Sequence, residues 1–237
     1  MSRSDLYLVD SYKKELATIV IEVIEGGAVL EQTIFYPQGG GQPMDKGVLI
    51  WNNEDYPVIE IKKIDDKLIH LTEHTFSVGD KVTVKIDWDY RYALMKHHTA
   101  LHILSAVVYR KYQAKVTGGT IYEDKARLDF DLSEFGFEMA NDLVEETNNE
   151  IRRDHLVEIE FLDREAADKN PELIRTKVNL LPKSINEIRT VKIGDIDLQA
   201  DGGLHVLKTS EIGEVQLVKI ENKGKGRKRI SISANLG

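Results

Sequence analysis

Residues 90–112 read YRYALMKHHTALHILSAVVYRKY, and this stretch divides the chain into two parts of different pattern. It contains neither Gly nor Pro, and Leu94, Leu101, Leu104 and Val108 recur at helical intervals. That periodicity predicts one long helix. Because the pattern changes here, we place a domain boundary just before it.

The residues before this helix are typical of short β-strands. They are rich in β-branched side chains, often alternate with polar ones, and are separated by turns that contain Gly or Asp. Such spacing favours a small antiparallel barrel, which we assign to residues 1–89. The clearest strands are expected at residues 18–23, 48–50, 58–62 and 82–86.

The residues after the helix mix helices and strands. We expect a second helix over residues 135–154 and a short third one that opens near Asn170 and Pro171, where Asn would cap the helix and Pro would occupy its first turn. The fold class is therefore α+β, with a second domain over residues 90–237. Its strands are expected at residues 127–130, 157–161, 191–193, 215–220 and 230–232.

Composition limits the chemistry that the chain can perform. Its 237 residues include 32 Lys and Arg against 40 Asp and Glu, a net charge of -8, and no Cys. The absence of cysteine excludes a disulfide framework, a thiolate metal site and a thiol nucleophile. Any metal must therefore be held by His, Asp, Glu or water, and any polyanion must meet a local basic patch.

Two pairs of potential metal ligands stand out. His98 and His102 are four residues apart on the predicted helix, which places both imidazoles on one face. Asp201 and His205 flank a Gly-Gly pair, so a carboxylate and an imidazole could converge from a loop. Simpler readings stay open, namely histidines that pack on a helix face and an ordinary Asp-Gly-Gly turn.

Several short motifs carry a family resemblance. Together they resemble, in order, the editing domain of alanyl-tRNA synthetase and its free-standing relatives, the AlaX proteins, over nearly the whole chain. They are residues 35–43 (FYPQGGGQP), 86–88 (IDW), 91–95 (RYALM), 98–104 (HTALHIL), 126–130 (ARLDF), 193–195 (IGD), 201–205 (DGGLH), 209–213 (TSEIG) and 226–230 (GRKRI).

The resemblance implies one Zn²⁺ per chain, held by His98, His102 and His205, with Asp201 as a further ligand. Asp201 stands where many members of the family have Cys, and Leu204 where many have Thr. A carboxylate in place of a thiolate keeps the negative charge but makes the site harder, so we expect weaker zinc binding. Water could also take the place of Asp201.

The resemblance further implies a trans-editing aminoacyl-tRNA hydrolase that acts without ATP. Its substrate would be Ser-tRNA(Ala), with Gly-tRNA(Ala) possible. Thr117 resembles the threonine that recognises the serine hydroxyl in small AlaX proteins, although it also reads as a strand-end residue before a turn. Gln42 and the run Gly39, Gly40 and Gly41 would contact the acceptor end, or form a tight turn.

A tRNA partner needs concentrated positive charge. The C-terminal segment supplies it, and we expect it to bind tRNA unless it is merely a solvated hairpin tip. We expect a cytoplasmic protein without a membrane span, an obligate protein partner or the C-terminal extension of larger relatives. The basic residues assigned to tRNA binding are Lys225, Arg227, Lys228 and Arg229.

Two alternatives remain at this level. The threonyl-tRNA synthetase editing domain shares the histidine motifs, so the substrate could be Ser-tRNA(Thr). The glycine-rich motif at residues 35–43 favours the alanine branch. Alternatively, the altered metal motif could mark a tRNA-binding module without activity.

Overall fold

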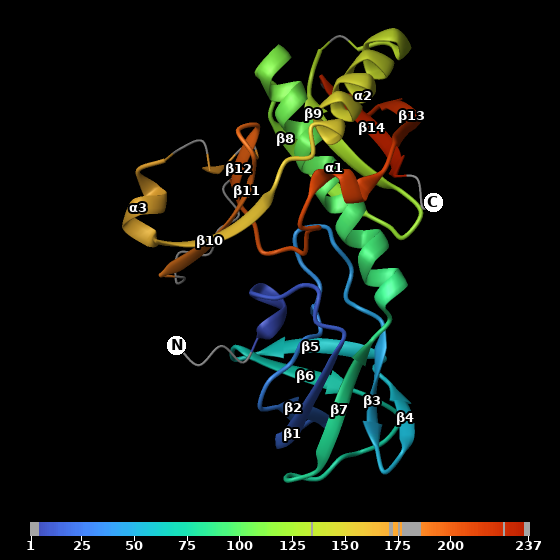
Figure 1. Cartoon of the computed structure of the whole chain (residues 1–237), viewed down its shortest axis with the longest axis vertical. Helices are drawn as coiled ribbons and strands as arrows, with labels where there is room; N and C mark the ends of the chain where they lie inside the picture. Colours follow the sequence, from blue (N-terminus) through green and yellow to red (C-terminus); the bar gives the residue numbers. More distant parts are fainter. Residues whose placement is uncertain are drawn as a thin grey trace. The chain divides into compact units, whose positions relative to one another are not determined.

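The computed structural model describes residues 5–133, 135–170, 173, 174, 176, 186–224 and 226–234. It divides into two compact units, residues 1–92 and residues 93–237 (Figure 1). The described residues contain antiparallel sheets and few helices, which confirms the α+β class. None of the described helices is long and apolar enough to cross a membrane.

The first unit is a curled antiparallel sheet of seven strands in the order β4-β3-β7-β1-β2-β6-β5. Its two outermost strands, β4 and β5, do not pair with each other in that order, so the sheet forms a half-barrel (Figure 1). A short 3₁₀ helix, η1 (Leu6–Leu8), precedes it. The strands are β1 (Glu15–Ile24), β2 (Gly27–Leu30), β3 (Gly47–Trp51), β4 (Glu54–Pro57), β5 (Glu60–Ile64), β6 (Lys67–Leu71) and β7 (Lys81–Ile86).

Strand β1 joins the two halves of this sheet. Its first part pairs with β7, with Ala17 opposite Thr83, and its second part pairs with β2, with Val23 opposite Ala28. The register shifts between Val20 and Glu22, and a bulge of this kind increases the local bend of a strand. This bulge in β1 therefore contributes to the curvature of the half-barrel.

A buried ion pair fastens the segment that carries the glycine-rich motif. Arg91 and Asp45 are both fully buried and pair through their side chains. Asp45 also accepts a hydrogen bond from the backbone N–H of Tyr36 at 2.6 Å, and the guanidinium of Arg91 donates to the carbonyl oxygen of Ser11 at 3.2 Å. Multiple hydrogen bonds of this kind compensate the cost of burying two charges.

The predicted long helix is confirmed as α1 (Trp88–Tyr112). Asp87 caps it, because its Oδ1 accepts a hydrogen bond from the backbone N–H of Tyr90 at 3.2 Å. The predicted stripe is buried, with Leu94 and Leu104 fully inaccessible. Most of the residues between Arg91 and Val108 are buried as well, so this helix has no broad solvent face.

The second unit contains a four-stranded antiparallel sheet in the order β13-β14-β9-β8. Helix α2 (Phe137–Arg152) packs against β13, close to the position predicted for the second helix. The buried amide of Asn148 donates to the carbonyl oxygen of Val215 at 2.9 Å and accepts from its N–H at 2.8 Å. The strands are β8 (Val116–Ile121), β9 (Ala126–Asp131), β13 (Val215–Asn222) and β14 (Arg227–Ala234).

A three-stranded antiparallel sheet, β10-β11-β12, completes this unit. The strands are β10 (Val157–Asp163), β11 (Glu187–Ile193) and β12 (Asp197–Ala200), and η3 (Thr209–Ile212) follows the loop after β12. Helix α3 (Arg164–Asp168) follows β10 directly and was not predicted. Part of the predicted third helix, at Pro171 and beyond, lies outside the described residues.

Candidate metal centre

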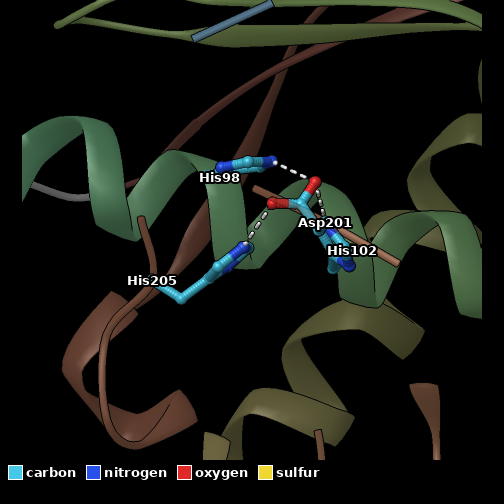
Figure 2. Close-up of side chains that lie close together, drawn as sticks. All are labelled: His98, His102, Asp201 and His205. Carbon is cyan, nitrogen blue, oxygen red and sulfur yellow. Dashed lines mark hydrogen bonds and ion pairs between the residues drawn. The ribbon is translucent and has the colours of Figure 1, made fainter. Parts of the chain in front are cut away.

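Four potential ligands converge from two elements of the second unit (Figure 2). His98 and His102 lie one turn apart on α1, as their spacing predicted. Asp201 and His205 lie on the loop between β12 and η3. Their ligand atoms are all within 4.8 Å of one another, and the three histidines are buried. Chain positions about 100 residues apart are thus brought to one point.

The distances suit a four-coordinate ion. Asp201 Oδ2 is 3.6 Å from Nε2 of His98 and 3.6 Å from Nε2 of His102, while Asp201 Oδ1 is 3.3 Å from Nε2 of His205. Tetrahedral zinc with bonds of about 2.0–2.1 Å has ligand atoms roughly 3.3–3.4 Å apart. Three imidazole nitrogens and a carboxylate group are also ligands that Zn²⁺ accepts. The residues present therefore fit the ion.

Two of the imidazoles have a hydrogen-bond partner at Nδ1, which leaves their Nε2 atoms facing the centre. Nδ1 of His102 is 2.8 Å from Oδ2 of Asp197, and Nδ1 of His205 is 3.2 Å from Oγ1 of Thr99. Thr99 donates its own hydroxyl hydrogen to the carbonyl oxygen of Met95 at 2.9 Å. Its oxygen therefore accepts the Nδ1–H of His205, and the lone pair of that ring lies on Nε2.

Gly203 allows the backbone of the loop to lie close to His98 on α1, because it has no side chain. A Cβ at this position would lie 2.5 Å from Nδ1 of His98 and closer still to Cε1 of the same ring. The backbone N–H of Gly203 also donates to Oδ1 of Asp201 at 2.5 Å, which fixes the carboxylate in a tight turn. Gly202, by contrast, has nothing within 4 Å of the corresponding position. Only the second glycine of the pair is required by the packing.

Electrostatics around the cluster favour a cation. Burial opposes ionisation of Asp201, yet the hydrogen bond and positive charge of the neighbouring His102 hold its pKa well below the ordinary value. Burial lowers the pKa of His98 to about 4, so this ring is neutral near pH 7. The pKa of His102 is raised to about 10, because hydrogen bonds to Asp197 and Asp201 outweigh burial. Two carboxylates thus attract positive charge to the site.

Comparisons with known proteins show the family of this chain. The chain is 41% identical over 230 residues to the alanyl-tRNA editing protein AlaX-M of Saccharolobus solfataricus, covering 95% of this chain and 96% of the relative. The AlaX-M protein of Methanosarcina mazei is 33% identical over 96% of this chain and 95% of its own length. The chain belongs to the AlaX family of alanyl-tRNA editing proteins.

One longer relative and two family models also match this AlaX chain. The AlaX-L protein of Pyrococcus horikoshii is 34% identical over 96% of this chain, which spans 57% of that relative. Family models match in two places, tRNA synthetases class II (A) at residues 5–90 and the threonyl and alanyl tRNA synthetase second additional domain at residues 188–231. The second match includes Asp201 and His205.

Thr117 occupies an irregular position in this AlaX chain. It lies where the register of β8 against β9 shifts, between Val116 opposite Phe130 and Gly118 opposite Asp129. Its Oγ1 is buried and has no hydrogen-bond partner among the described residues. A buried hydroxyl without a partner is energetically costly.

The glycine-rich segment forms a tight turn. Gly40 and Gly41 have positive φ angles of 55° and 90°, and the backbones of Gly39 and Gln42 exchange two hydrogen bonds of 3.1 and 2.8 Å. The side chain of Gln42 is buried. This is the turn that the sequence offered as an alternative, and contact with a tRNA acceptor end stays a prediction.

The basic residues of the C-terminal segment differ in their availability. Arg227 is exposed, while Arg229 donates to both carboxylate oxygens of Asp129, at 2.6 and 2.8 Å. Lys228 is half-buried, and Lys225 lies outside the described residues. Arg229 therefore forms an ion pair with Asp129, which its position among other basic residues in the sequence did not predict.

Sequence reasoning did not identify Asp197 and Thr99 as parts of this centre. Both act through a histidine from a distant position, and neither has a recognisable spacing of its own. His97 is adjacent to His98 but is not among the four converging residues. Its Nε2 accepts a hydrogen bond from the N–H of Ala234 at 3.0 Å. His97 therefore binds the last residue of β14.

Proposed function

We propose that this chain is a zinc-dependent trans-editing hydrolase that deacylates Ser-tRNA(Ala), with Gly-tRNA(Ala) as a second substrate. The observation that carries the proposal is the convergence of three imidazoles and the Asp201 carboxylate in a chain of the AlaX family. Aminoacyl-tRNA is made and used in the cytoplasm, so we place the protein there. We propose no obligate protein partner.

The reaction is hydrolysis of the ester between the amino acid and the terminal adenosine. When bound, Zn²⁺ would supply a Lewis acid for the carbonyl, a water of lowered pKa, or an anchor for a substrate hydroxyl or amino group. His98, His102, His205 and Asp201 would hold it. The chain has no Cys and no Ser in a Gly-x-Ser-x-Gly motif, so we propose direct attack by water.

An editing enzyme must distinguish serine from alanine, which differ by one hydroxyl. We assign this task to Thr117, supported by its buried Oγ1 without a partner among the described residues. Serine would complete the hydrogen bond of that hydroxyl, whereas alanine would leave it unsatisfied. A missing partner in a buried site costs about 1–3 kcal/mol, enough for a useful preference.

We propose that tRNA contacts come from two segments with little negative charge. The first is the turn of Gly39, Gly40 and Gly41 with Gln42. The second comprises Lys225, Arg227, Lys228 and Arg229, with Arg227 the most exposed of its described members. Cations there would contact phosphates and offset the net charge of -8.

The test uses the purified protein with Ser-tRNA(Ala), Gly-tRNA(Ala), Ala-tRNA(Ala) and Ser-tRNA(Thr), each with and without a chelator. We expect release of serine from the first substrate, slower release of glycine, no loss of alanine, and inhibition by the chelator. Failure to release serine from Ser-tRNA(Ala) would overturn the proposed substrate. Undiminished hydrolysis after metal removal would overturn the zinc dependence.

A metal titration tests the ligands separately. His98→Ala and His102→Ala should each reduce bound zinc, measured by elemental analysis after dialysis. Asp201→Cys should bind zinc more tightly than the native protein, because a thiolate is the softer ligand. Unchanged affinity in Asp201→Cys would show that Asp201 is not a ligand.

A second candidate is editing of Ser-tRNA(Thr). The matched additional domain at residues 188–231 is described as shared by threonyl and alanyl tRNA synthetases, which favours this alternative over unrelated substrates. Activity on Ser-tRNA(Thr) alone would select it. Zinc binding and tRNA binding without any hydrolysis would instead select a module that has lost its activity.

A further inference from the structure

Asp197 is the first residue of β12, four residues before Asp201, and its side chain is fully buried. It is not among the four residues that converge on the candidate metal centre. Its Oδ2 lies 2.8 Å from Nδ1 of His102, on the opposite side of the ring from Nε2. A buried carboxylate thus contacts the back of one candidate ligand.

The carboxylate of Asp197 is itself held in place. Nε2 of Gln199 donates to both of its oxygens, at 3.0 Å each. Asp197 and Gln199 are two residues apart on β12, so their side chains lie on the same face of that strand. The result is a chain of contacts from Gln199 through Asp197 to His102.

This arrangement has a defined consequence for the imidazole. A carboxylate that accepts the Nδ1–H of His102 keeps that hydrogen on Nδ1, so Nε2 is the nitrogen that would give up its proton and bind a metal. It also increases the electron density of the ring, which makes Nε2 a stronger ligand. Because a carboxylate is a weaker zinc ligand than a thiolate, support from a buried carboxylate behind His102 would matter more in this site.

We propose that Asp197 is a positioning residue that orients His102 and strengthens zinc binding in this cysteine-free site, with Gln199 holding the carboxylate. The inference rests on the proposed metal centre and goes beyond it, since Asp197 would act through His102 without touching the ion. It predicts an energetic coupling between Asp197 and His102 that a general role in folding would not produce.

The experiment measures zinc affinity by competition with a chromophoric chelator for the native protein and Asp197→Asn. The same substitution is then made in a His102→Ala background. We expect Asp197→Asn to weaken zinc binding by about 10- to 100-fold in the native background. In the His102→Ala background the further loss should be less than about twofold, because the partner ring is gone.

Two further variants guard against misfolding. Gln199→Leu leaves both partners in place, removes only the amide that holds Asp197, and should weaken zinc binding by up to about tenfold. Asp129→Asn removes a carboxylate of the same unit that pairs with Arg229, and should leave zinc affinity unchanged. Thermal unfolding in the presence of a chelator reports the stability of each metal-free variant.

The outcomes separate this inference from the proposed function. Zinc binding by the native protein with equal affinity in Asp197→Asn and Gln199→Leu would overturn the role of Asp197 and leave the metal centre intact. Equal losses in both backgrounds would also overturn it, since they indicate a general structural effect. No zinc binding by the native protein would overturn the metal centre, and the role of Asp197 with it.

Discussion

Asp201 is the residue at which the three imidazoles of the centre meet. Its two oxygens face different rings, with Oδ1 toward His205 and Oδ2 toward His98 and His102. A single thiolate sulfur in this position would offer one atom to the same space. The orientation of the carboxylate therefore matters as well as its position. The Gly203 N–H helps to set that orientation, because it donates a hydrogen bond to Oδ1.

Gly203 provides a sharp test at this scale. Gly203→Ala would push a methyl group into the ring of His98, so we expect zinc affinity to fall by at least about tenfold. Gly202→Ala is the matched control, because its added methyl group meets nothing within 4 Å. Competition with a chelator measures both, and equal affinities would contradict the packing described for the loop.

Thr117 allows a test of substrate choice. Thr117→Val keeps the shape of the side chain and removes the hydroxyl, so hydrolysis of Ser-tRNA(Ala) should fall by about 10- to 100-fold. Thr117→Ser retains the hydroxyl and should retain most of the activity. Rates with Ala-tRNA(Ala) should not change. A Thr117→Val protein that still prefers serine over alanine as strongly as the native protein would exclude this role.

At the scale of elements, β13 is an outer strand of the four-stranded sheet, and α2 covers its end. Outer strands present unpaired backbone groups, which proteins commonly cover or pair. Here the side chain of Asn148 bonds both the N–H and the C=O of Val215. One residue thus joins the helix to the sheet edge.

Removing the two hydrogen bonds between the Asn148 side chain and the backbone of Val215 should destabilise the second unit. In Asn148→Ala the buried N–H and C=O of Val215 lose the side chain that binds them, and we expect the free energy of unfolding to drop by about 2–4 kcal/mol. Asn149→Ala, at the exposed neighbouring position, should change it by less than about 0.5 kcal/mol. Urea denaturation followed by circular dichroism gives both values. Similar losses of stability in the two variants would contradict the role given to the Asn148 hydrogen bonds.

At the scale of the whole molecule, pH dependence of stability has an identifiable source in the first unit. His70 is buried, with Nδ1 3.1 Å from the carbonyl oxygen of Ala28 and Nε2 3.0 Å from Oγ1 of Thr33. Burial lowers its pKa to about 4. Between pH 6.5 and 4, the unfolded chain therefore binds a proton that the folded chain excludes.

The stabilisation is complete above pH 6.5 and is lost as the pH falls toward 4. Comparison with His70→Gln isolates this contribution, since all other titrating groups are present in both proteins. Between pH 7 and pH 4.5 the native protein should lose about 2 kcal/mol more of its unfolding free energy than the variant. Parallel curves from urea denaturation across this range would show that His70 does not control the dependence.

The sequence by itself determined the α+β class, the long helix and the four residues that could hold a metal. Helical periodicity is local, so the spacing of His98 and His102 already placed both rings on one face. Some boundaries were less exact, since the strand expected at residues 58–62 is β5 at Glu60–Ile64. The helix α3 was missed because it is only one short turn after β10.

Only the tertiary structure decided which distant groups meet. It brought Asp201 and His205 to α1, placed Asp197 and Thr99 behind their imidazoles, and paired Arg229 with Asp129. The physical reason is that hydrogen bonds and ion pairs between distant residues depend on strand register and on the packing of side chains. Spacing along the chain records neither, so the sequence identified the candidate ligands and only the tertiary structure showed which residues contact them.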